Sequence, residues 1–314
     1  MNCSHTHSNA HEHEHHLLDE LVTLRDWLRY TITRFNRQQL FFGHGCTNAY
    51  DEAVWLLLAT LSLPPEHLDV FLDACIPSEE REQLFTAIEN RCEVKIPTAY
   101  LTHEIWLSGF RFYIDGRALI PRSFFGELLE DSLAPWIPDP MQITQALDLC
   151  TGSGCLAILM AHAFPSAHIV GADISSDALD VARRNVTDYD LNDRIELIET
   201  DLFSQLQERQ FDLIISNPPY VTDTAMETLP AEYQHEPRLA LTGGTDGLDI
   251  VRQLLAQAHN HLTPNGILAV EIGHNRHLVE QAFPDLPFTW LSTPSGEENM
   301  IFILHREDLP GMAE

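Results

Sequence analysis

Residues 211–220 read Phe-Asp-Leu-Ile-Ile-Ser-Asn-Pro-Pro-Tyr. The apolar, β-branched run at 213–215 is typical of a parallel strand that is buried on both faces. The strand ends in the tetrapeptide Asn-Pro-Pro-Tyr at 217–220. A residue before proline favours extended backbone, and neither proline has an N–H. This stretch therefore predicts a buried strand whose end presents carbonyl acceptors without competing donors.

The tetrapeptide suits the binding of a planar amino group, which has two N–H donors. The side-chain oxygen of Asn217 and the carbonyl of Pro218 could each accept one of them, while Tyr220 offers an aromatic face. Such contacts assist catalysis only if they strengthen as positive charge develops on the nitrogen. Taken alone, the tetrapeptide is equally consistent with a rigid turn that closes a strand. The candidate substrate-binding residues are Asn217, Pro218, Pro219 and Tyr220.

Around this stretch, predicted strands and helices alternate, which is the signature of an α/β fold with a mostly parallel sheet covered on both faces. Besides the opening stretch, strands are predicted at 145–149, 168–172, 195–199, 267–272, 288–291 and 300–304. Helices are predicted at 155–164, 178–186, 248–262 and after His277. A further helix is expected to run from Ser123 through Leu133.

Polar and glycine residues follow the first three of these strands. Ligands of open α/β sheets bind beyond the carboxyl ends of the strands. Glycines at 152 and 154 let the backbone approach a ligand at the start of a helix, and Asp173 is placed to receive ribose hydroxyls. This pattern predicts a nucleoside cofactor. The third glycine of a dinucleotide-binding loop is absent because Ala157 occupies its position, and the tetrapeptide at 217–220 favours S-adenosylmethionine.

Some members of this constellation have a simpler interpretation. Asp148 could serve only to orient the glycine loop, and Asp201 could cap the following turn. Cys150 and Cys155, which flank the loop, are interpreted as packing residues because no base is evident for them.

The first part of the chain has a different character. Residues 1–16 form a polar, histidine-rich stretch that predicts a disordered tail. Apolar residues recur at helical spacing over 17–92, and two β-rich runs over 93–122 predict a hairpin that links this helical domain to a catalytic domain at 123–314. The segment Phe-Gly-His-Gly at 42–45 is either a helix connection or a substrate contact.

Composition limits the classes of function. A chain of 314 residues suits roughly two domains, and it contains neither a membrane-spanning run nor the apolar core of a signal peptide. Six scattered cysteines indicate reduced thiols in a cytoplasmic protein, and no metal site is expected. A net charge of −29 argues against nucleic acid as the direct substrate and suits a basic protein partner, although solubility alone could also explain it.

Several motifs resemble class I methyltransferases, which have a Rossmann-like, mostly parallel seven-stranded sheet. The similarity is to the group that methylates the side-chain amide of glutamine in translation proteins, and it covers nearly everything after Leu17. The matching motifs are Ile-Pro-x-Ala-Tyr-Leu at 96–101, Ile-Pro-Arg at 120–122, the glycine loop, Asn-Pro-Pro-Tyr, Glu-Pro-Arg-Leu-Ala-Leu at 236–241 and Gly-x-Asp-Gly-Leu at 244–248.

Two branches of this group differ in their motifs. Release-factor enzymes usually carry Gly-Thr-Gly-x-Gly, whereas Cys150 stands at the first position here. Asp-x-Cys-Thr-Gly-Ser-Gly, the 42–45 segment followed by Asp-Glu-Ala at 51–53, and Pro-Phe-Thr-Trp at 287–290 resemble the branch that modifies a glutamine of the third large-subunit ribosomal protein.

The resemblance implies roles for individual residues. Asn217, Pro218 and Tyr220 would be catalytic and hold the glutamine amide, and Leu202 stands where relatives often have an aromatic residue, which leaves stacking on adenine open. The residues implied to hold S-adenosylmethionine are Thr151, Gly152, Gly154, Asp173, Asp201 and Asn217.

The expected function is therefore the transfer of methyl from S-adenosylmethionine to a glutamine of that ribosomal protein. The nearest alternative is methylation of release factors. Methylation of an adenine amine uses the same tetrapeptide but is disfavoured by the acidic charge. A non-catalytic role in ribosome assembly would be indicated by loss of Asn217 or the glycines, and both are present.

Overall fold

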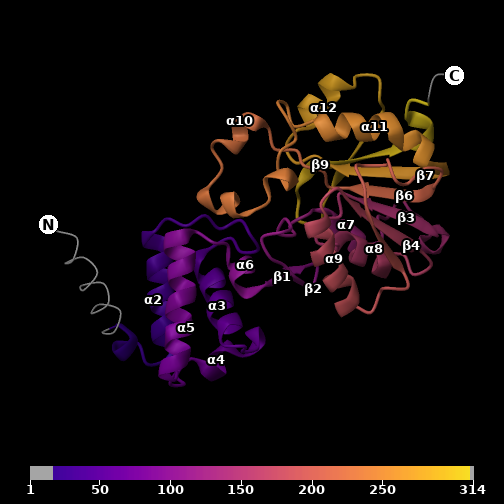
Figure 1. Cartoon of the computed structure of the whole chain (residues 1–314). Coiled ribbons are helices and arrows are strands. Elements are labelled where there is room, and N and C mark those ends of the chain that lie inside the picture. The colour runs from indigo at the N-terminus through magenta and orange to yellow at the C-terminus, as the bar shows by residue number, and fades with distance from the viewer. Residues whose placement is uncertain (1–16, 312–314) are drawn as a thin grey trace. The chain divides into compact units, whose positions relative to one another are not determined.

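The computed structural model describes residues 17–311, and the histidine-rich stretch 1–16 lies outside the described residues. The chain divides into two compact units, with the boundary between His103 and Glu104 (Figure 1). No helix within residues 17–311 has the length and apolar character needed to cross a membrane.

The first unit is helical, as the spacing of its apolar residues predicts. A capping box fixes the start of its first long helix, in which Thr23 and Asp26 satisfy each other's backbone N–H groups. Trp27 and Phe35 of that helix are fully buried against its neighbours. The helices are α2 (Leu24–Arg37), α3 (Ala49–Thr60), α4 (Leu68–Phe71), α5 (Ser78–Glu89) and α6 (Thr98–Thr102), with the short turns η1 (Pro65–His67) and η2 (Asn90–Val94).

A buried ion pair holds the centre of this unit. Arg91 donates to the Glu52 carboxylate across 2.5 Å, and Thr98 donates to the same oxygen across 2.8 Å. Arg91 also donates to the carbonyl of Phe41, at the start of the connection between α2 and α3. His44 in that connection is buried. The segment at 42–45 is therefore a helix connection that packs into its own unit.

The second unit begins with an antiparallel hairpin, formed by β1 (Glu104–Leu107) and β2 (Phe110–Tyr113) as predicted. The next helix, α7 (Phe125–Glu130), is shorter than predicted. Ser132 and Leu133 adopt left-handed backbone with φ of 52° and 59°, which cannot continue a right-handed helix. The turn η3 (Pro140–Gln142) then leads into the sheet.

The predicted seven-stranded, mostly parallel sheet is confirmed. Its order is β5-β4-β3-β6-β7-β9-β8, and only the pairs β7–β9 and β8–β9 are antiparallel. The strands are β3 (Gln145–Leu149), β4 (His168–Asp173), β5 (Ile195–Glu199), β6 (Phe211–Ser216), β7 (Leu262–Glu271), β8 (Thr289–Ser292) and β9 (Glu298–His305). Strand β7 starts earlier than predicted, because an irregularity in its pairing with β6 accommodates Pro264.

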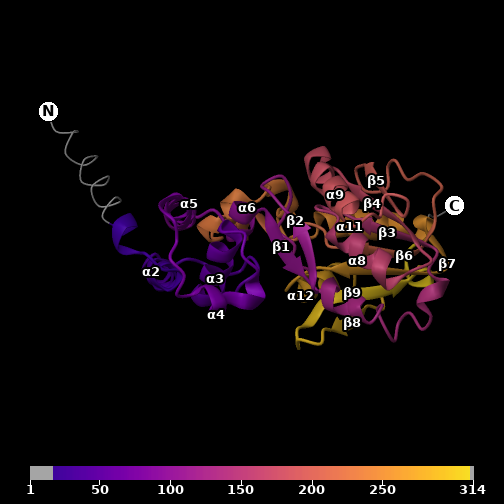
Figure 2. The same cartoon turned by 90° about the horizontal axis from the view of Figure 1, so that it is seen from below.

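Helices cover both faces of this sheet (Figures 1 and 2). Leu147 and Leu149 of β3 pack in the core that contains α11, whereas Asp148 between them bonds to the first turn of α8 on the other face. The helices are α8 (Cys155–Ala163), α9 (Ser176–Asp188), α10 (Asp223–Met226), α11 (Asp249–His261) and α12 (Arg276–Ala282), with the turns η4 (Ala231–His235), η5 (Arg238–Ala240) and η6 (Arg306–Asp308).

Candidate functional site

The strand order reverses at β3, because the connection after β3 leads to β4 on one side and β6 lies on the other. Ligand sites of open α/β sheets form at such a switch point. A pocket within the second unit lies there, at the carboxyl ends of these strands. Of the residues predicted from the sequence, its lining includes Thr151, Gly152, Asp173, Asp201, Asn217 and Pro219.

Asp148 fixes the loop that follows β3. Its Oδ2 atom accepts from the Thr151 hydroxyl at 2.5 Å and from the Ala157 N–H in α8 at 2.9 Å. The side chain is fully buried, and burial raises the pKa of this carboxyl to about 7. Its Oδ1 atom has no hydrogen-bond partner among residues 17–311. Asp148 therefore ties the loop to the helix behind it and does not reach the pocket surface.

The two glycines of the loop have different roles. Gly152 has a φ of 55°, and a Cβ there would meet no atom within 4 Å, so its backbone faces open space at the pocket. Gly154 has a φ of 78°, and a Cβ there would lie 3.0 Å from the Cβ of Ala182 in α9. Gly154 is absent from the pocket lining and instead permits close packing of two helices.

Asp173 ends β4 and faces the glycine loop. Its carboxylate accepts from the Gly152 N–H at 2.8 Å and from the Ser175 N–H at 2.9 Å. Burial raises its pKa, although these backbone bonds favour the charged form. Because backbone donors orient the carboxylate at the pocket wall, Asp173 is preorganised to accept hydrogen bonds from a ligand.

Asp201, beyond the end of β5, is exposed at the pocket, and its carbonyl accepts from the Ser204 N–H. The following Leu202 lines the pocket with little exposed area. The next aromatic residue, Phe203, turns into the core and stacks on His261 with ring centroids 4.5 Å apart. An aliphatic side chain therefore occupies this position of the pocket wall.

Two of the four residues of the tetrapeptide after β6 line the pocket, and the other two do not. Asn217 and Pro219 line the pocket, whereas Pro218 and Tyr220 are absent from its lining. The Tyr220 ring packs on Gly273, where a Cβ would lie 2.7 Å from the ring. The Asn275 side chain donates to the Tyr220 carbonyl at 2.8 Å. Burial raises the pKa of the Tyr220 hydroxyl, and the nearby Glu271 carboxylate adds to the shift.

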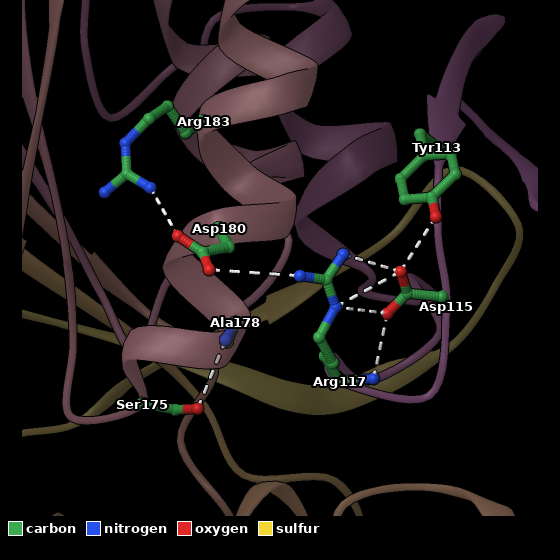
Figure 3. Close-up of polar contacts among 7 residues, drawn as sticks. All are labelled: Tyr113, Asp115, Arg117, Ser175, Ala178, Asp180 and Arg183. Atoms are coloured by element: carbon green, nitrogen blue, oxygen red, sulfur yellow. Dashed lines mark hydrogen bonds and ion pairs between the residues drawn. The ribbon is translucent and has the colours of Figure 1, made fainter.

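One wall of the pocket was not predicted from the sequence. It is formed by the loop that follows the hairpin. Arg117 and Arg122 are among its residues. Arg117 and Tyr113 both donate hydrogen bonds to the Asp115 carboxylate (Figure 3). The Arg117 Nη2 atom lies 2.7 Å from Oδ2, and the Tyr113 hydroxyl lies 2.8 Å from the same oxygen. Arg117 holds the pKa of Asp115 low, at about 2. Its Nη1 atom also lies 3.9 Å from Asp180 of α9. The loop is therefore fixed beside the start of α9.

A second unpredicted wall comes from the segment between β6 and α11. Pro237, Leu239, Ala240 and Thr242 line the pocket. The Oγ1 atom of Thr242 is buried and has no hydrogen-bond partner in the described part of the chain. The sequence motifs at 120–122 and 236–241 overlap these two walls. Nothing in the sequence, however, indicated that the two motifs line the same pocket.

The two thiols at the pocket are held in the unreactive, protonated form. Cys150 and Cys155 both line the pocket, and burial raises both thiol pKa values, that of Cys155 to about 12. No group of three histidine, cysteine, aspartate or glutamate residues within 17–311 is arranged to hold a metal ion. The polar groups of the pocket are instead carboxylates, hydroxyls, guanidinium groups, the Asn217 amide and backbone N–H groups.

Comparison with known proteins identifies close relatives. Residues 131–233 match the family model of the methyltransferase small domain. A protein of Neisseria meningitidis serogroup A, named ribosomal protein uL3 glutamine methyltransferase, is 56% identical over 292 residues, covering 93% of this chain and 96% of the relative. The Bordetella pertussis protein of that name is 51% identical over 290 residues, covering 92% and 97%.

A more distant sequence relative carries the same name. The Francisella tularensis protein of that name is 38% identical over 291 residues, covering 93% of both chains. Among solved structures, a methyltransferase from Pyrococcus furiosus superposes with a TM-score of 0.45 at 16% identity, covering 74% of this chain and 99% of that one. The assignment rests on the sequence relatives, which span almost the whole chain.

These relatives confirm the predicted methyltransferase fold and the branch that the Cys-Thr-Gly-Ser-Gly loop and the 42–45 segment indicated. These two relatives match 92–93% of this chain and 96–97% of their own length. The chain therefore belongs to the ribosomal protein uL3 glutamine methyltransferase family.

Proposed function

We propose that this protein transfers a methyl group from S-adenosylmethionine to the side-chain amide nitrogen of a glutamine in uL3, the third large-subunit ribosomal protein. The observation that carries this proposal is the 56% identity to a relative of that name over 93% of this chain and 96% of the relative. Such similarity across both units supports the same substrate as well as the same chemistry.

The pocket fits the proposed cofactor. The open space at Gly152 leaves room for a ligand against the backbone, and the Asp173 carboxylate is held by two backbone donors at the end of β4. We assign cofactor binding to Thr151, Gly152, Asp173, Asp201 and Asn217, with Gly154 acting through helix packing. S-adenosylmethionine supplies an electrophilic methyl group on a sulfonium centre.

The amide is activated by orientation. An amide nitrogen is a poor nucleophile because its lone pair is delocalised into the carbonyl. In the proposed arrangement, the Asn217 side-chain oxygen and the Pro218 carbonyl each accept one N–H of the glutamine and favour loss of planarity at nitrogen. The nitrogen gains the methyl group as the carbon–sulfur bond of the sulfonium breaks, the bonding electron pair stays on sulfur in the demethylated cofactor, and one nitrogen proton passes to water. These acceptors stabilise the positive charge that develops on nitrogen, and no covalent enzyme intermediate is required.

Tyr220 supports this arrangement from behind the pocket wall. Its ring is packed on Gly273 and its carbonyl is held by Asn275, so the backbone of the tetrapeptide is fixed at its end. We therefore assign Tyr220 a positioning role. Asn217 lines the pocket and contacts the amide, and the backbone carbonyl of the buried Pro218 is proposed as the second acceptor. Pro219 lines the pocket beside Asn217 and adds no N–H that could compete for the same acceptors.

The partner and location follow from the same proposal. A ribosomal protein is basic, and this chain has a net charge of −29, which suits a protein partner better than a direct nucleic-acid substrate. We assign the activity to the cytoplasm, where ribosomal proteins are synthesised and assembled.

Radiolabelled methyl transfer to purified uL3 tests the proposal. The intact protein with labelled S-adenosylmethionine should label uL3 on one glutamine, identified by tandem mass spectrometry. Label on lysine or on the backbone, or no label with freshly purified uL3, would contradict the proposal. Isothermal calorimetry with S-adenosylmethionine and its demethylated product checks cofactor binding separately from turnover.

A further inference from the structure

Leu239 is a large apolar side chain that the second unit leaves in water. Its exposed fraction is 58%, although its neighbour Leu241 is 4% exposed. Single exposed apolar residues are common on protein surfaces and need no explanation by themselves. Leu239 differs because it lines the same pocket as Asn217 and Pro219. It therefore lies at the exposed rim of the pocket that contains Asn217.

A buried ion pair anchors one end of the turn that carries Leu239. The Glu236 carboxylate accepts from both terminal nitrogens of Arg122, at 2.6 and 2.8 Å, and from the Ile120 N–H at 3.1 Å. The Glu236 side chain is fully buried. Because a two-pronged arginine–carboxylate contact fixes both distance and orientation, Glu236 holds the start of the turn against the loop after the hairpin.

Backbone hydrogen bonds anchor the other end. The Ala240 N–H bonds to the Pro237 carbonyl, and the Thr242 N–H to the Arg238 carbonyl. The Val221 N–H donates to the Leu241 carbonyl at 2.9 Å, just after the tetrapeptide at 217–220. Leu239 is thus presented on a turn whose end is bonded to Val221, the residue that follows the tetrapeptide. Because the turn is already ordered, a ligand that contacts Leu239 causes little further loss of conformational entropy.

The position of Leu239 indicates what it contacts. Apart from Asn217, which is also assigned to the amide, the residues assigned to the cofactor follow or end β3, β4 and β5. Leu239 instead belongs to the segment between β6 and α11, which also carries Asn217. An apolar contact on this side, next to the amide-binding residue, suits the aliphatic atoms of a polypeptide that carries the glutamine.

We propose that Leu239 is a substrate-positioning residue that packs on the glutamine-bearing segment of uL3. This inference rests on the proposed function, since it assumes that the pocket receives a glutamine of that protein. The anchored turn holds the segment at the pocket rim so that the amide reaches Asn217. The contact acts on substrate binding, and cofactor binding does not depend on it.

The test compares Leu239→Ala with Leu239→Met and with Met141→Ala. Met141 is 57% exposed but is absent from the pocket lining, so its variant matches the loss of an exposed apolar side chain elsewhere. Leu239→Ala should lower kcat/KM for uL3 roughly tenfold, through KM, because partial burial of a leucine is lost. Leu239→Met should restore most of the activity, and Met141→Ala should match the intact protein. Affinity for S-adenosylmethionine, measured by calorimetry, should be unchanged in all three.

Equal KM values for Leu239→Ala and the intact protein would overturn the inference while leaving the proposed function standing. Weakened cofactor binding in Leu239→Ala would assign the residue to the cofactor instead, which also overturns it. Direct binding of uL3, measured without turnover in the presence of the demethylated cofactor, separates the two proposals. If the intact protein neither binds nor methylates uL3, both fail.

Discussion

Two side chains on either side of β3 carry the proposed chemistry. Asp173 ends β4 and Asn217 follows β6, and both strands pair directly with β3. The glycine loop after β3 lies between them and donates the Gly152 N–H to Asp173. The cofactor and the amide are thus assigned to adjacent strand ends, which brings the methyl donor and the acceptor nitrogen into one pocket.

Replacing Asp173 with alanine should weaken S-adenosylmethionine binding. The carboxylate is expected to accept ribose hydroxyls, and hydrogen bonds to a charged group contribute about 1.5–3 kcal/mol. Calorimetric titration of the folded variant measures the loss. Asp285→Ala, which removes an exposed carboxylate away from the pocket, is the control and should bind normally. Unchanged affinity in Asp173→Ala would remove this residue from the site.

Replacing Asn217 with alanine should reduce methyl transfer by roughly 10²-fold or more, comparable to the loss of one preorganised polar contact in a transition state. Cofactor affinity should fall much less, provided that Asn217 acts mainly on the amide. Single-turnover kinetics with uL3 measures the rate of the chemical step. Asn265→Ala, at an exposed position outside the pocket, should leave the rate unchanged. Nearly intact turnover in Asn217→Ala would mean that the tetrapeptide serves only as a turn and does not act on the amide.

At the scale of elements, buried carboxylates tie the loop after the hairpin to the sheet and to the segment after β6. Glu236 holds Arg122, and Glu271 at the end of β7 accepts from the Ser123 hydroxyl at 2.5 Å and the Phe124 N–H at 3.1 Å. Both contacts lie next to a pocket wall that includes Arg122 and Ser123. The wall is therefore held by side chains from distant parts of the chain.

The Glu271 contact predicts a pH dependence of stability. Burial raises the pKa of Glu271 to about 7, above its ordinary value of 4.5, although the Ser123 bond opposes the shift. The folded state then binds more protons than the unfolded state between these values, so this group lowers the free energy of unfolding as pH rises from about 4.5 to about 7. Glu271→Gln cannot ionise, and its stability relative to the intact protein should rise across that window by about 2–3 kcal/mol.

Urea unfolding of both proteins at pH 5 and pH 8 measures this difference. Glutamine keeps a carbonyl oxygen that can accept from Ser123 and Phe124, so the folded contacts should survive the change. The exposed Glu298→Gln should show no comparable trend, because its side chain is already in water. A stability difference for Glu271→Gln that is the same at both pH values would contradict the assigned shift.

The sequence predicted the elements whose signal is local. Alternation of apolar runs and glycine-marked turns placed all seven strands of the sheet, because buried strands need continuous apolar residues. It overextended α7, since the left-handed backbone at Ser132 and Leu133 has no signature in ordinary residues. It did not predict that Arg122 pairs with Glu236, which lies 114 residues later, because charge complementarity alone cannot choose among many carboxylates.

In the candidate site, too, positions set by local sequence were predicted, and contacts between distant residues were not. Residues at strand ends, such as Asp173 and Asn217, were predicted because their positions follow from the strand order. Tyr220 was expected to present its ring to the substrate, and the structure packs that ring on Gly273 instead of in the pocket lining. The direction of a side chain in an irregular segment depends on packing by distant residues, which sequence spacing does not report.

At the scale of the whole molecule, the two units divide the proposed tasks. All residues assigned to the cofactor and the amide belong to the second unit, and none of the pocket lining comes before Arg117. Because the pocket lies entirely in the second unit, we assign the choice of protein substrate to surfaces outside the pocket, of which the helical unit is the first candidate.

Exchange of the helical unit tests this assignment. Residues 17–92 mark the helical region in the sequence, but Thr98 bonds to Glu52 inside the same buried cluster, so the exchange should end at His103. A chimera with the equivalent region of a release-factor enzyme should bind S-adenosylmethionine normally and lose methylation of uL3. Methyl transfer to each purified substrate measures the outcome. A chimera that still methylates uL3 would place substrate choice in the second unit.

Salt should slow the reaction with uL3 through association. The chain carries a net charge of −29 and the proposed substrate is basic, so attraction at long range raises the rate of encounter and is screened as ionic strength increases. Stopped-flow association at several salt concentrations measures this rate. A rate that is independent of salt would mean that the acidic surface serves solubility and has no part in recognition.

Mass spectrometry of uL3 and release factors from cells that lack this protein tests the central assignment most directly. The account predicts that uL3 loses one methyl group on a glutamine side chain, that release factors keep theirs, and that the intact gene restores the modification while an Asn217→Ala version does not. Loss of the methyl group from release factors, with uL3 still methylated, would contradict the account.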